Sequence, residues 1–413
     1  MKRSIASRNQ AHPVEALQAP QTDADARVFY EFFAGGGMAR AGLQQWRCAF
    51  ANDFDPMKAA VYRDNWGGDH LVCGDVAKVT TEQLPGKADL VWGSFPCQDL
   101  SLAGTIRGLG SADAEQHTRS GTFWPFWSLL EALRGEGRAP RTLILENVYG
   151  AITSNQGRDF AAICQVLADA GYRFGAMVVD AKRFVAQSRP RLFIVAVREE
   201  VAVPAELVSD QPSQAWSPPR LVAAYDALPE ATRSKAIWWA LPEPEGAPTR
   251  FSELIEDHPG DVDWHTRAET AKLLAMMSPV NHAKVEAAKK AGRRMVGGVY
   301  RRTRLDSRGM KVQRAEVRFD EVAGCLRTPA GGSSRQIILV VDGNKVRSRL
   351  LSGREAARLM GLDDDYKLPA RYNDAYHVAG DGVVVPVVSH LASALVEPIL
   401  DFDDSARVLL AAE

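Results

Sequence analysis

The chain has 413 residues, too long for one ordinary hydrophobic core, and this length predicts two domains. Hydrophobic residues make up 46% and charged residues 24% of the chain, and no stretch approaches eighteen uninterrupted apolar residues, so a membrane protein is not expected. A net charge of -1 does not by itself indicate a partner. The five cysteines are widely spread without a C-x-x-C pair, which argues against a metal site and a disulfide framework. Residues 1–26 are polar and lack a signal peptide's apolar stretch, so we expect a disordered arm and a cytoplasmic protein.

The first predicted domain covers residues 27–198, where short apolar runs alternate with amphipathic stretches. Strands are predicted at 27–33, 48–53, 70–76, 88–94, 142–147, 173–179 and 191–197. Helices are predicted at 38–46, 55–66, 124–135 and 157–172. Such repeated units build an α/β fold with a doubly wound, mostly parallel sheet, and ligands bind beyond the carboxyl ends of its strands.

After residue 198 this pattern stops. A Pro- and Ser-rich linker opens residues 199–345, whose weak periodicity predicts a second, smaller, loop-rich domain. Within it, residues 284–318 carry twelve Lys or Arg against three acidic residues. This basic block is a candidate surface for a polyanion, and a solvated charged face would have the same composition.

Regular pattern returns in a connecting segment, residues 346–379. Ser352 and Glu355 stand three residues apart there, which matches a capping box at the start of a helix. The apolar residues 380–402 predict a last helix, which we expect to complete the first domain.

Three successive strand ends indicate a nucleoside site. A glycine cluster at 35–37 follows the first strand and allows close approach of a ligand. Asp53, after the second strand, stands where an acid commonly holds a ribose, and Asp75, after the third, is suited to an adenine amino group. Arg40 occupies the last position of a G-x-G-x-x-G pattern, which disfavours a dinucleotide-dependent oxidoreductase.

The next strand ends carry reactive side chains. Cys97 and Glu146 follow consecutive strands, which are usually adjacent, and a thiol nucleophile beside a protonated carboxyl suits attack on an electron-poor heterocycle. Taken singly, Cys97 could also be a small buried residue and Glu146 a salt-bridge partner. Gln187, Arg189 and Arg191 alternate into a strand and so share one face, as functional side chains or as an edge-strand charge set.

Together these residues resemble the DNA (cytosine-5) methyltransferase family, of bacterial restriction-modification or orphan type. The motifs that carry the resemblance are, in order, FAGGG, NDFD, GDV, GSFPCQ, ENV, QSRPR, RLLSGREAARLMGL and GDGVVVPVV. The resemblance implies an S-adenosylmethionine-dependent methyltransferase fold, with 199–345 as a target-recognition domain that faces double-stranded DNA. It also implies a possible cognate restriction endonuclease in the same cell and a protein that acts as a monomer.

The resemblance further implies roles for single residues. Cys97 would add to C6 of a flipped cytosine, while Glu146 would engage N3 and the exocyclic amine. The residues with expected catalytic roles are Cys97, Glu146, Arg189, Arg191, Pro96 and Asn147. Expected cofactor contacts are Phe33, Gly35, Gly36, Gly37, Asp53, Phe54, Asp75, Val76 and Asp381. Expected DNA contacts are Gln98, Ser101, Gln187, Arg301, Arg302 and Arg304.

Three positions depart from the family pattern. Met38 stands where another glycine is usual, Asp53 where glutamate is commoner, and Asp381 where the tenth motif usually carries asparagine. The extra carboxylate of Asp381 could change the cofactor contacts. Two alternatives share the resemblance: a non-catalytic DNA-binding scaffold, which would lack the thiol or the carboxyl, and a transfer-RNA methyltransferase, which would have a shorter recognition region.

Overall fold

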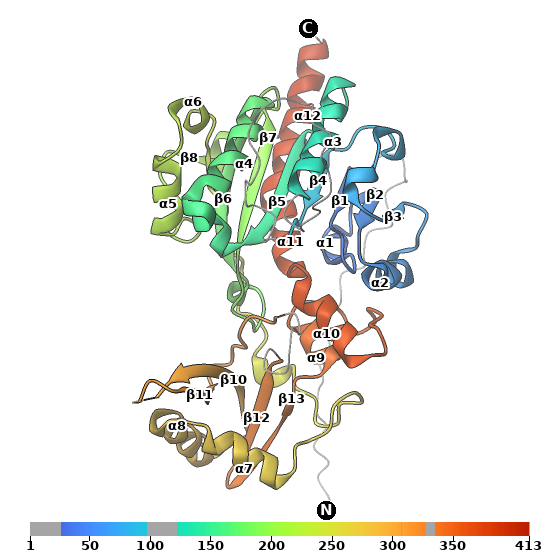
Figure 1. Cartoon of the computed structure of the whole chain (residues 1–413). Helices are drawn as coiled ribbons and strands as arrows, with labels where there is room; N and C mark the ends of the chain where they lie inside the picture. The colour runs from blue at the N-terminus through green and yellow to red at the C-terminus, as the bar shows by residue number, and fades with distance from the viewer. Residues whose placement is uncertain (1–25, 97–121, 307, 328–334, 413) are drawn as a thin grey trace, which may run out of the picture.

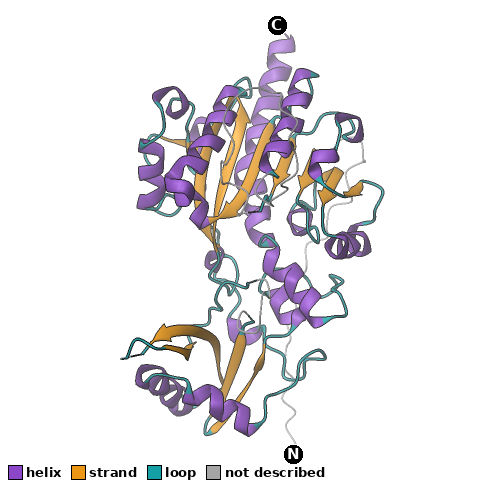
Figure 2. Ribbon diagram, viewed as in Figure 1, coloured by secondary structure: helices purple, strands orange, loops and turns teal. Residues whose placement is uncertain are grey.

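The computed structural model describes residues 26–96, 122–306, 308–327 and 335–412, which form a larger and a smaller domain (Figures 1 and 2). The expected N-terminal arm lies outside the described residues apart from Ala26. The larger domain contains both the start and the end of the described chain, and the smaller domain is inserted between them.

A seven-stranded sheet in the order β3-β2-β1-β4-β5-β7-β6 forms the centre of the larger domain. Its strands are β1 (Val28–Phe32), β2 (Arg47–Asp53), β3 (Leu71–Cys73), β4 (Leu90–Gly93), β5 (Thr142–Val148), β6 (Tyr172–Asp180) and β7 (Pro190–Arg198). β7 runs antiparallel to both neighbours, and all other pairs of adjacent strands are parallel. The predicted doubly wound, mostly parallel sheet is therefore confirmed. The carboxyl ends of β1 to β5 lie at one edge, where β7 begins.

Helices cover both faces of this sheet. They include α1 (Met38–Gly42), α2 (Pro56–Trp66), α3 (Phe123–Gly135) and α4 (Arg158–Asp169). Alternate strand residues enter two separate cores, with Val91 on the α3 side and Trp92 on the side of the C-terminal helices. α1 is shorter than the predicted helix 38–46. After Gly42 the chain turns, and the Trp46 ring nitrogen donates to Glu397 at 2.7 Å, so a tertiary contact replaces the last helical turn.

The C-terminal part is helical and continues beyond the predicted residues 380–402. It comprises α10 (Tyr372–Asp381), α11 (Val385–Leu391), the π-helical turn η9 (Ala392–Val396) and α12 (Glu397–Ala412). The run 372–411 is long and apolar enough to cross a membrane by length and composition, but 56% of its most apolar window is buried inside the protein. That burial is typical of a core helix, because α11 and η9 pack against the large sheet.

The smaller domain is an ordered sheet, whereas the sequence predicted a loop-rich fold. Strands β10 (Met295–Leu305), β11 (Lys311–Arg318), β12 (Ile337–Asp342) and β13 (Lys345–Leu350) pair antiparallel in the order β11-β10-β12-β13. Helices α7 (Arg267–Ala275) and α8 (Pro279–Lys290) cover one face (Figure 1). β10 carries two glycines and three arginines without apolar alternation, so its pairing with the buried β12 orders it, and local sequence pattern does not reveal it.

The boundary between the domains also differs from the expected one at residue 199. Residues 205–241 contain β8 (Val208–Ser209), α5 (Pro219–Asp226), α6 (Glu230–Arg233) and β9 (Trp238–Trp239). This segment packs on the larger domain: Trp216 and Trp239 are buried, and a β-carbon on Gly175 of β6 would lie 2.3 Å from the Trp239 ring nitrogen. The smaller domain therefore begins after Leu241, because these aromatic side chains need the surface of β6.

A buried ion pair joins the smaller sheet to α9 (Gly353–Arg358). The Glu355 carboxylate accepts two hydrogen bonds from Arg349 at 2.6 and 2.7 Å, and both side chains are fully buried. The same carboxylate accepts from the backbone N–H groups of Ser352 and Glu256. The predicted capping box between Ser352 and Glu355 is confirmed. All four acceptor positions of this carboxylate are thus used at the domain junction.

We expect Glu355→Ala to lower the free energy of unfolding by about 3–5 kcal/mol, because it leaves the Arg349 cation buried without its partner. Chemical denaturation followed by tryptophan fluorescence measures this change. Asp364→Ala is the matched control, since it removes the partner of Arg358 from an ion pair in which the Asp364 side chain is 64% exposed. The control should lose less than about 1 kcal/mol. Equal losses in both variants would contradict the assignment.

Candidate active site

The turn after β1 brings three glycines to the carboxyl edge of the large sheet. Gly35 has a φ of 56°, and a β-carbon there would meet no atom within 4 Å, so a ligand can approach its backbone. Gly36 and Gly37 are instead needed for packing. A β-carbon on Gly36 would lie 2.3 Å from the Tyr366 hydroxyl, and one on Gly37 would lie 2.4 Å from the Trp66 ring nitrogen. Both rings donate to the carbonyl of Gly36. The contact expected from all three glycines is therefore available at Gly35, and the others shape the turn.

Two aromatic residues flank this turn. Phe33 adopts a φ of 58°, a backbone conformation that is strained for residues other than glycine. The centre of its ring lies 5.8 Å from that of Phe126. Phe54 is 75% exposed, an unusual position for a phenyl ring in water and a suitable one for covering a planar base. Val76 was expected beside the same ligand, but its side chain is buried in the core, so only its backbone can face the site.

The two acidic residues at the strand ends hold their own turns. Asp53 is buried and accepts from the backbone N–H groups of Gly35 at 2.7 Å and Asp55 at 2.8 Å. Burial raises the pKa of Asp53, and these hydrogen bonds oppose the rise. Asp75 is partly exposed and accepts from Ala77 at 3.0 Å. Each carboxylate keeps lone pairs that can accept from a hydroxyl or amino group, so a structural role does not exclude ligand binding.

The turn between α10 and α11 closes the same region, and two of the three departures from the family pattern, Asp381 at the end of α10 and Met38 of α1, lie beside it. Asp381 accepts from Lys58 of α2 at 2.6 Å. Burial opposes the charge of Lys58, but Asp381 and Asp53 outweigh it and raise the pKa of this lysine. Met38 fills the space above Gly382, where a β-carbon would lie 2.1 Å from the Met38 sulfur. Both unusual side chains are therefore accommodated by contacts with partners elsewhere in the chain.

Glu146 lies at the end of β5 beside the segment that leads to Pro96. β4 and β5 are parallel neighbours with Gly93 opposite Leu145, so the residues that follow leave the sheet at one edge. Arg191 of β7 approaches Glu146 with 3.3 Å between Nε and Oε1. Burial raises the pKa of Glu146, and the nearby guanidinium groups of Arg191 and Arg189 oppose this rise. The arrangement favours the protonated carboxyl more than the environment of an exposed glutamate would.

The residue after Glu146 anchors the segment that follows β4. Asn147 is buried, and its side-chain amide donates to the carbonyl of Phe95 at 3.1 Å. Pro96 comes next and is exposed. Three expected site residues, Cys97, Gln98 and Ser101, lie outside the described residues. The structure therefore brings the start of the GSFPCQ motif against ENV, as the adjacency of the two strands predicted.

Gln187 cannot contact DNA in this structure, which corrects the expected assignment. Its side chain is fully buried, donates to the carbonyl of Leu359 at 2.8 Å and accepts from the N–H of Leu326 at 3.0 Å. The sequence placed Gln187 on a strand face, but β7 begins only at Pro190. The side chain is instead used to join the larger domain to α9 and to the strand-free segment before β12.

Arg189 likewise does not present a free guanidinium to a base. It is buried, and its terminal nitrogens donate to the carbonyls of Leu326, Gly380 and Gly382 at 3.1, 2.9 and 2.8 Å. Burial lowers its pKa to about 10. We therefore reassign Arg189 from a catalytic residue to a positioning residue, because its hydrogen bonds hold three backbone segments together. Arg191 is the arginine of this motif that reaches Glu146.

The three arginines expected to bind DNA all lie on β10 of the smaller domain. Arg301 is partly exposed, and Arg302 and Arg304 each have half of their side chain exposed. The latter two share Glu316 of β11 as a partner, at 3.5 and 2.7 Å. Arg302 also lies over the ring of Tyr300. These contacts hold the guanidinium groups of Arg302 and Arg304 on the sheet face that α7 and α8 leave uncovered, whereas Arg301 alternates onto the same face as Val299, which packs against these helices.

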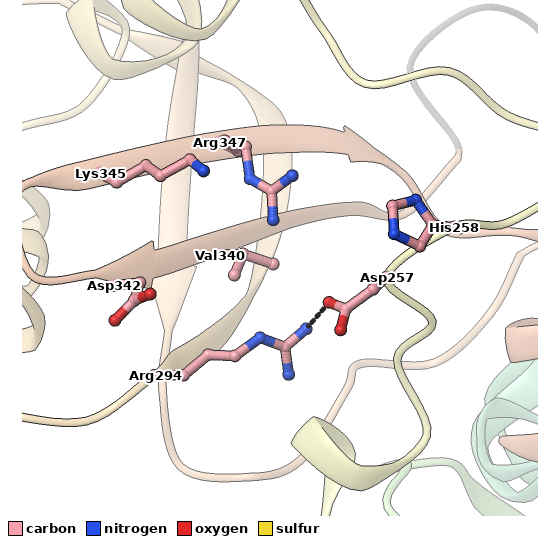
Figure 3. Close-up of a pocket in the computed structure, with 7 residues that line it drawn as sticks. All are labelled: Asp257, His258, Arg294, Val340, Asp342, Lys345 and Arg347. Atoms are coloured by element: carbon pink, nitrogen blue, oxygen red, sulfur yellow. Dashed lines mark hydrogen bonds and ion pairs between the residues drawn. The ribbon is translucent and has the colours of Figure 1, made fainter.

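A shallow hollow of about 300 Å³ lies on the same domain (Figure 3). Its lining residues are Asp257, His258, Arg294, Val340, Asp342, Lys345 and Arg347. Arg294 is paired with Asp257 at 3.0 Å, and Arg347 lies 4.1 Å from the ring centre of Trp264. None of the site residues expected from the sequence lines this hollow, so we assign it no part in the chemistry.

The sequence did not indicate three further residues that contact the site, Lys58, Tyr366 and Cys325. The sulfur of Cys325 lies 3.4 Å from Arg189 and 4.0 Å from Arg191. Lys58 is 323 residues from Asp381, and Tyr366 is 330 residues from Gly36. No local pattern marks such pairs. The unusual carboxylate of Asp381 was the one available signal, because an added charge next to a ligand site requires a partner.

The sequence matches the family described as C-5 cytosine-specific DNA methylase over residues 28–397. It is 25% identical over 370 residues to the Type II methyltransferase M.NlaX of Neisseria lactamica, covering 88% of this chain and 95% of that protein. Identity with the Type II methyltransferase M.HpaII of Haemophilus parainfluenzae is 24% over 408 residues, covering 93% and 94%. The crystal structure of S. pombe Dnmt2 methyltransferase has a similar fold, with a TM-score of 0.58 at 16% identity, covering 91% and 99% of the two chains.

The pair of Lys58 and Asp381 can be tested by a double-mutant cycle of cofactor binding. S-adenosylmethionine carries one more positive charge than S-adenosylhomocysteine. Lys58→Met leaves an uncompensated carboxylate and should raise the preference for S-adenosylmethionine severalfold, whereas Asp381→Asn leaves an excess lysine and should lower it. The double variant should recover the wild-type ratio of dissociation constants, measured by calorimetry. A double variant whose ratio stays as far from the wild-type value as that of either single variant would contradict mutual neutralisation.

Proposed function

Because this chain belongs to the C-5 cytosine-specific DNA methylase family, we propose the part that each of its site residues takes in that family's reaction. The protein is a DNA (cytosine-5) methyltransferase that uses S-adenosylmethionine. Membership of this family sets aside the oxidoreductase, and the relatives named Type II methyltransferases, which match 88% and 93% of this chain, favour a DNA methyltransferase over the scaffold and transfer-RNA alternatives. The assignment of residues depends on one observation above all: Glu146, paired with Arg191, lies at the sheet edge to which the strand before Cys97 leads.

Cys97 is the proposed nucleophile, and it acts on a cytosine flipped out of the duplex. Its thiolate forms a bond to C6, and the electron pair of the C5–C6 double bond becomes available at C5. S-adenosylmethionine supplies the methyl group that C5 accepts. The C5 proton is then lost to a base, the C5–C6 double bond reforms, and the Cys97 thiolate leaves. The hydrogen bond from Asn147 to the carbonyl of Phe95 supports a fixed approach of the residues that precede the thiol.

Glu146 is the proposed partner of the cytosine ring. Its buried carboxyl, with a pKa raised by desolvation, can donate to N3 while C6 is attacked and so accommodate the negative charge that reaches the ring. Arg191 keeps this pKa from rising further and orients the carboxyl through its Nε. Arg189 supports the same geometry indirectly, by holding the backbone next to Arg191.

The residues at the strand ends fit a nucleoside ligand. Gly35 leaves open space beside its backbone, which is the space that a side chain would fill. Phe54 presents an exposed ring for an adenine to stack on, and Asp75 is exposed enough to accept from the adenine amino group. Asp53 is proposed to accept from the ribose hydroxyls with the lone pairs that Gly35 and Asp55 leave free.

The smaller domain is the proposed target-recognition domain. Its basic strand β10 carries Arg301, Arg302 and Arg304 on an exposed hairpin, and charged side chains of this kind bind phosphates. The relatives named Type II methyltransferases support a cognate restriction endonuclease as a cellular partner. We further propose that the protein acts as a monomer in the cytoplasm, because one chain supplies every site residue named above.

The decisive test of the reaction is transfer of labelled methyl groups to unmethylated duplex DNA, read by bisulfite sequencing. Wild-type protein should methylate cytosine within a defined sequence, and Cys97→Ala should lose essentially all activity, because the covalent adduct can no longer form. Cys164→Ala is the control, since this thiol is buried in the core away from the site edge. Label on adenine, or unchanged transfer by the Cys97 variant, would overturn the mechanism.

The role of Arg191 predicts a shift in the pH profile. Activity requires protonated Glu146, so turnover should fall as pH rises through the pKa of this carboxyl. Arg191→Met removes a positive charge that lowers that pKa, so the fall should move to higher pH by about one to three units. Arg198→Met on the far end of β7 is the control and should leave the profile in place. A shift toward lower pH would exclude this role for Glu146.

Replacement of Arg301, Arg302 and Arg304 by alanine should weaken DNA binding and flatten its salt dependence. The slope of log K against log salt concentration should decrease by about 0.9 for each phosphate that the variant no longer neutralises. Arg134→Ala removes an arginine in a similar exposed ion pair on α3 and should change neither quantity. Binding of S-adenosylmethionine should persist in all variants, and its loss would mean that the hairpin has been misassigned.

A further inference from the structure

The segment between β11 and β12 passes along the residues that precede β7. Ala323 exchanges two backbone hydrogen bonds with the residues on either side of Gln187, at 2.7 and 2.9 Å. Leu326 N–H donates to the Gln187 side chain at 3.0 Å. Gly324 and Cys325 lie between these two anchors, so the backbone on each side of them is fixed to the larger domain.

Cys325 places its sulfur beside the two arginines of the site. The sulfur accepts from Arg189 at 3.4 Å and lies 4.0 Å from a terminal nitrogen of Arg191. Arg191 also donates to the carbonyl of Pro190 at 3.0 Å, and its Nε lies 3.3 Å from the Glu146 carboxyl. Cys325 is therefore the contact through which the segment before β12 reaches the guanidinium that faces Glu146.

Tyr300 of β10 packs directly on Gly324. A β-carbon on Gly324 would lie 1.7 Å from the Tyr300 hydroxyl, and the next two nearest atoms also belong to the Tyr300 ring. The hydroxyl oxygen is buried, and Arg302 lies over the ring, 5.7 Å from its centre, so the ring has little room to move. Gly324 does not adopt a positive φ, so its backbone conformation does not require glycine. The closeness of the Tyr300 ring is the reason that no side chain fits there.

We propose that Tyr300 and Gly324 position Arg191, because the Tyr300 ring fixes the segment whose Cys325 sulfur borders the Arg191 guanidinium. The smaller domain then helps to set the charge that the Glu146 carboxyl experiences. This inference rests on the proposed roles of Glu146 and Arg191 in the reaction. Tyr300 and Gly324 act through Arg191, so they are positioning residues. The catalytic edge of the larger domain is thus completed by a contact that the smaller domain supplies.

The proposal has a consequence for pH because Arg191 has the largest opposing effect on the pKa of Glu146. Burial raises this pKa, and Arg191, Arg189 and the hydroxyl of Ser94 oppose the rise. Among the described residues, the charged and titratable groups around the Cys325 sulfur are Arg189, Arg191, Tyr300 and Tyr376. A displacement of Arg191 away from Glu146 therefore raises the pKa of this carboxyl further.

The test measures kcat against pH for the full chain at saturating DNA and S-adenosylmethionine. Gly324→Ala drives a methyl group into the Tyr300 ring, so the segment shifts, and the fall in turnover should move to higher pH by about half to one unit. Tyr300→Leu releases the segment and should shift the profile in the same direction. The double variant should return close to wild type, because the methyl group fills the space that the ring end leaves. Gly260→Ala, in open space on the same domain, is the control and should leave the profile in place.

In an Arg191→Met background, Gly324→Ala should add no further shift, because its effect passes through Arg191. A shift that adds fully to that of Arg191→Met would overturn the proposal, and so would a loss of turnover that is uniform across pH. Thermal unfolding followed by circular dichroism shows which variants fold, and Tyr300→Leu, which introduces no clash, carries the test if Gly324→Ala unfolds. Wild-type protein without methyl transfer, or an Arg191→Met profile that does not move, would instead refute the proposed function.

Discussion

The buried guanidinium of Arg189 is the contact on which the geometry of the site depends. It donates to carbonyls at Leu326, Gly380 and Gly382, and so joins the start of β7 to the segment before β12 and to the turn between α10 and α11. Burying a cation is costly, as its lowered pKa shows, and three carbonyl acceptors offset that cost. Because Arg191 follows two residues later, the same contact fixes the strand that brings it to Glu146.

The turn that Arg189 holds is also where this chain departs from its family pattern. Asp381 adds a carboxylate and Lys58 neutralises it, while Met38 packs directly on Gly382. These residues come from three distant parts of the chain and meet within one turn of the cofactor region. Lys58 therefore neutralises the charge that Asp381 adds, and Gly382 leaves room for the side chain of Met38.

The two domains use their sheets differently. The large sheet is covered on both faces, and the proposed site residues leave its carboxyl edge, from Gly35 to Glu146. The small sheet is covered by helices on one face, and its β10–β11 ribbon extends past them. A rigid edge suits chemistry that requires fixed distances, whereas a projecting ribbon suits contact with a long, grooved substrate.

The sequence by itself determined the large sheet, the order of its strand ends and the family, because strand period and the residue types at strand ends are local properties. It also predicted the capping box at Ser352 and the adjacency of the strands before Cys97 and Glu146.

Only the tertiary structure decided that Gln187 and Arg189 are buried, that residues 205–241 belong with the larger domain, and that the smaller domain is an ordered sheet. Each of these depends on partners more than a hundred residues away or on a neighbouring surface, such as the carbonyls that Arg189 binds or the groove at Gly175 that Trp239 fills. Which residues meet over such distances depends on how whole helices and strands pack, and a local sequence pattern does not predict that packing.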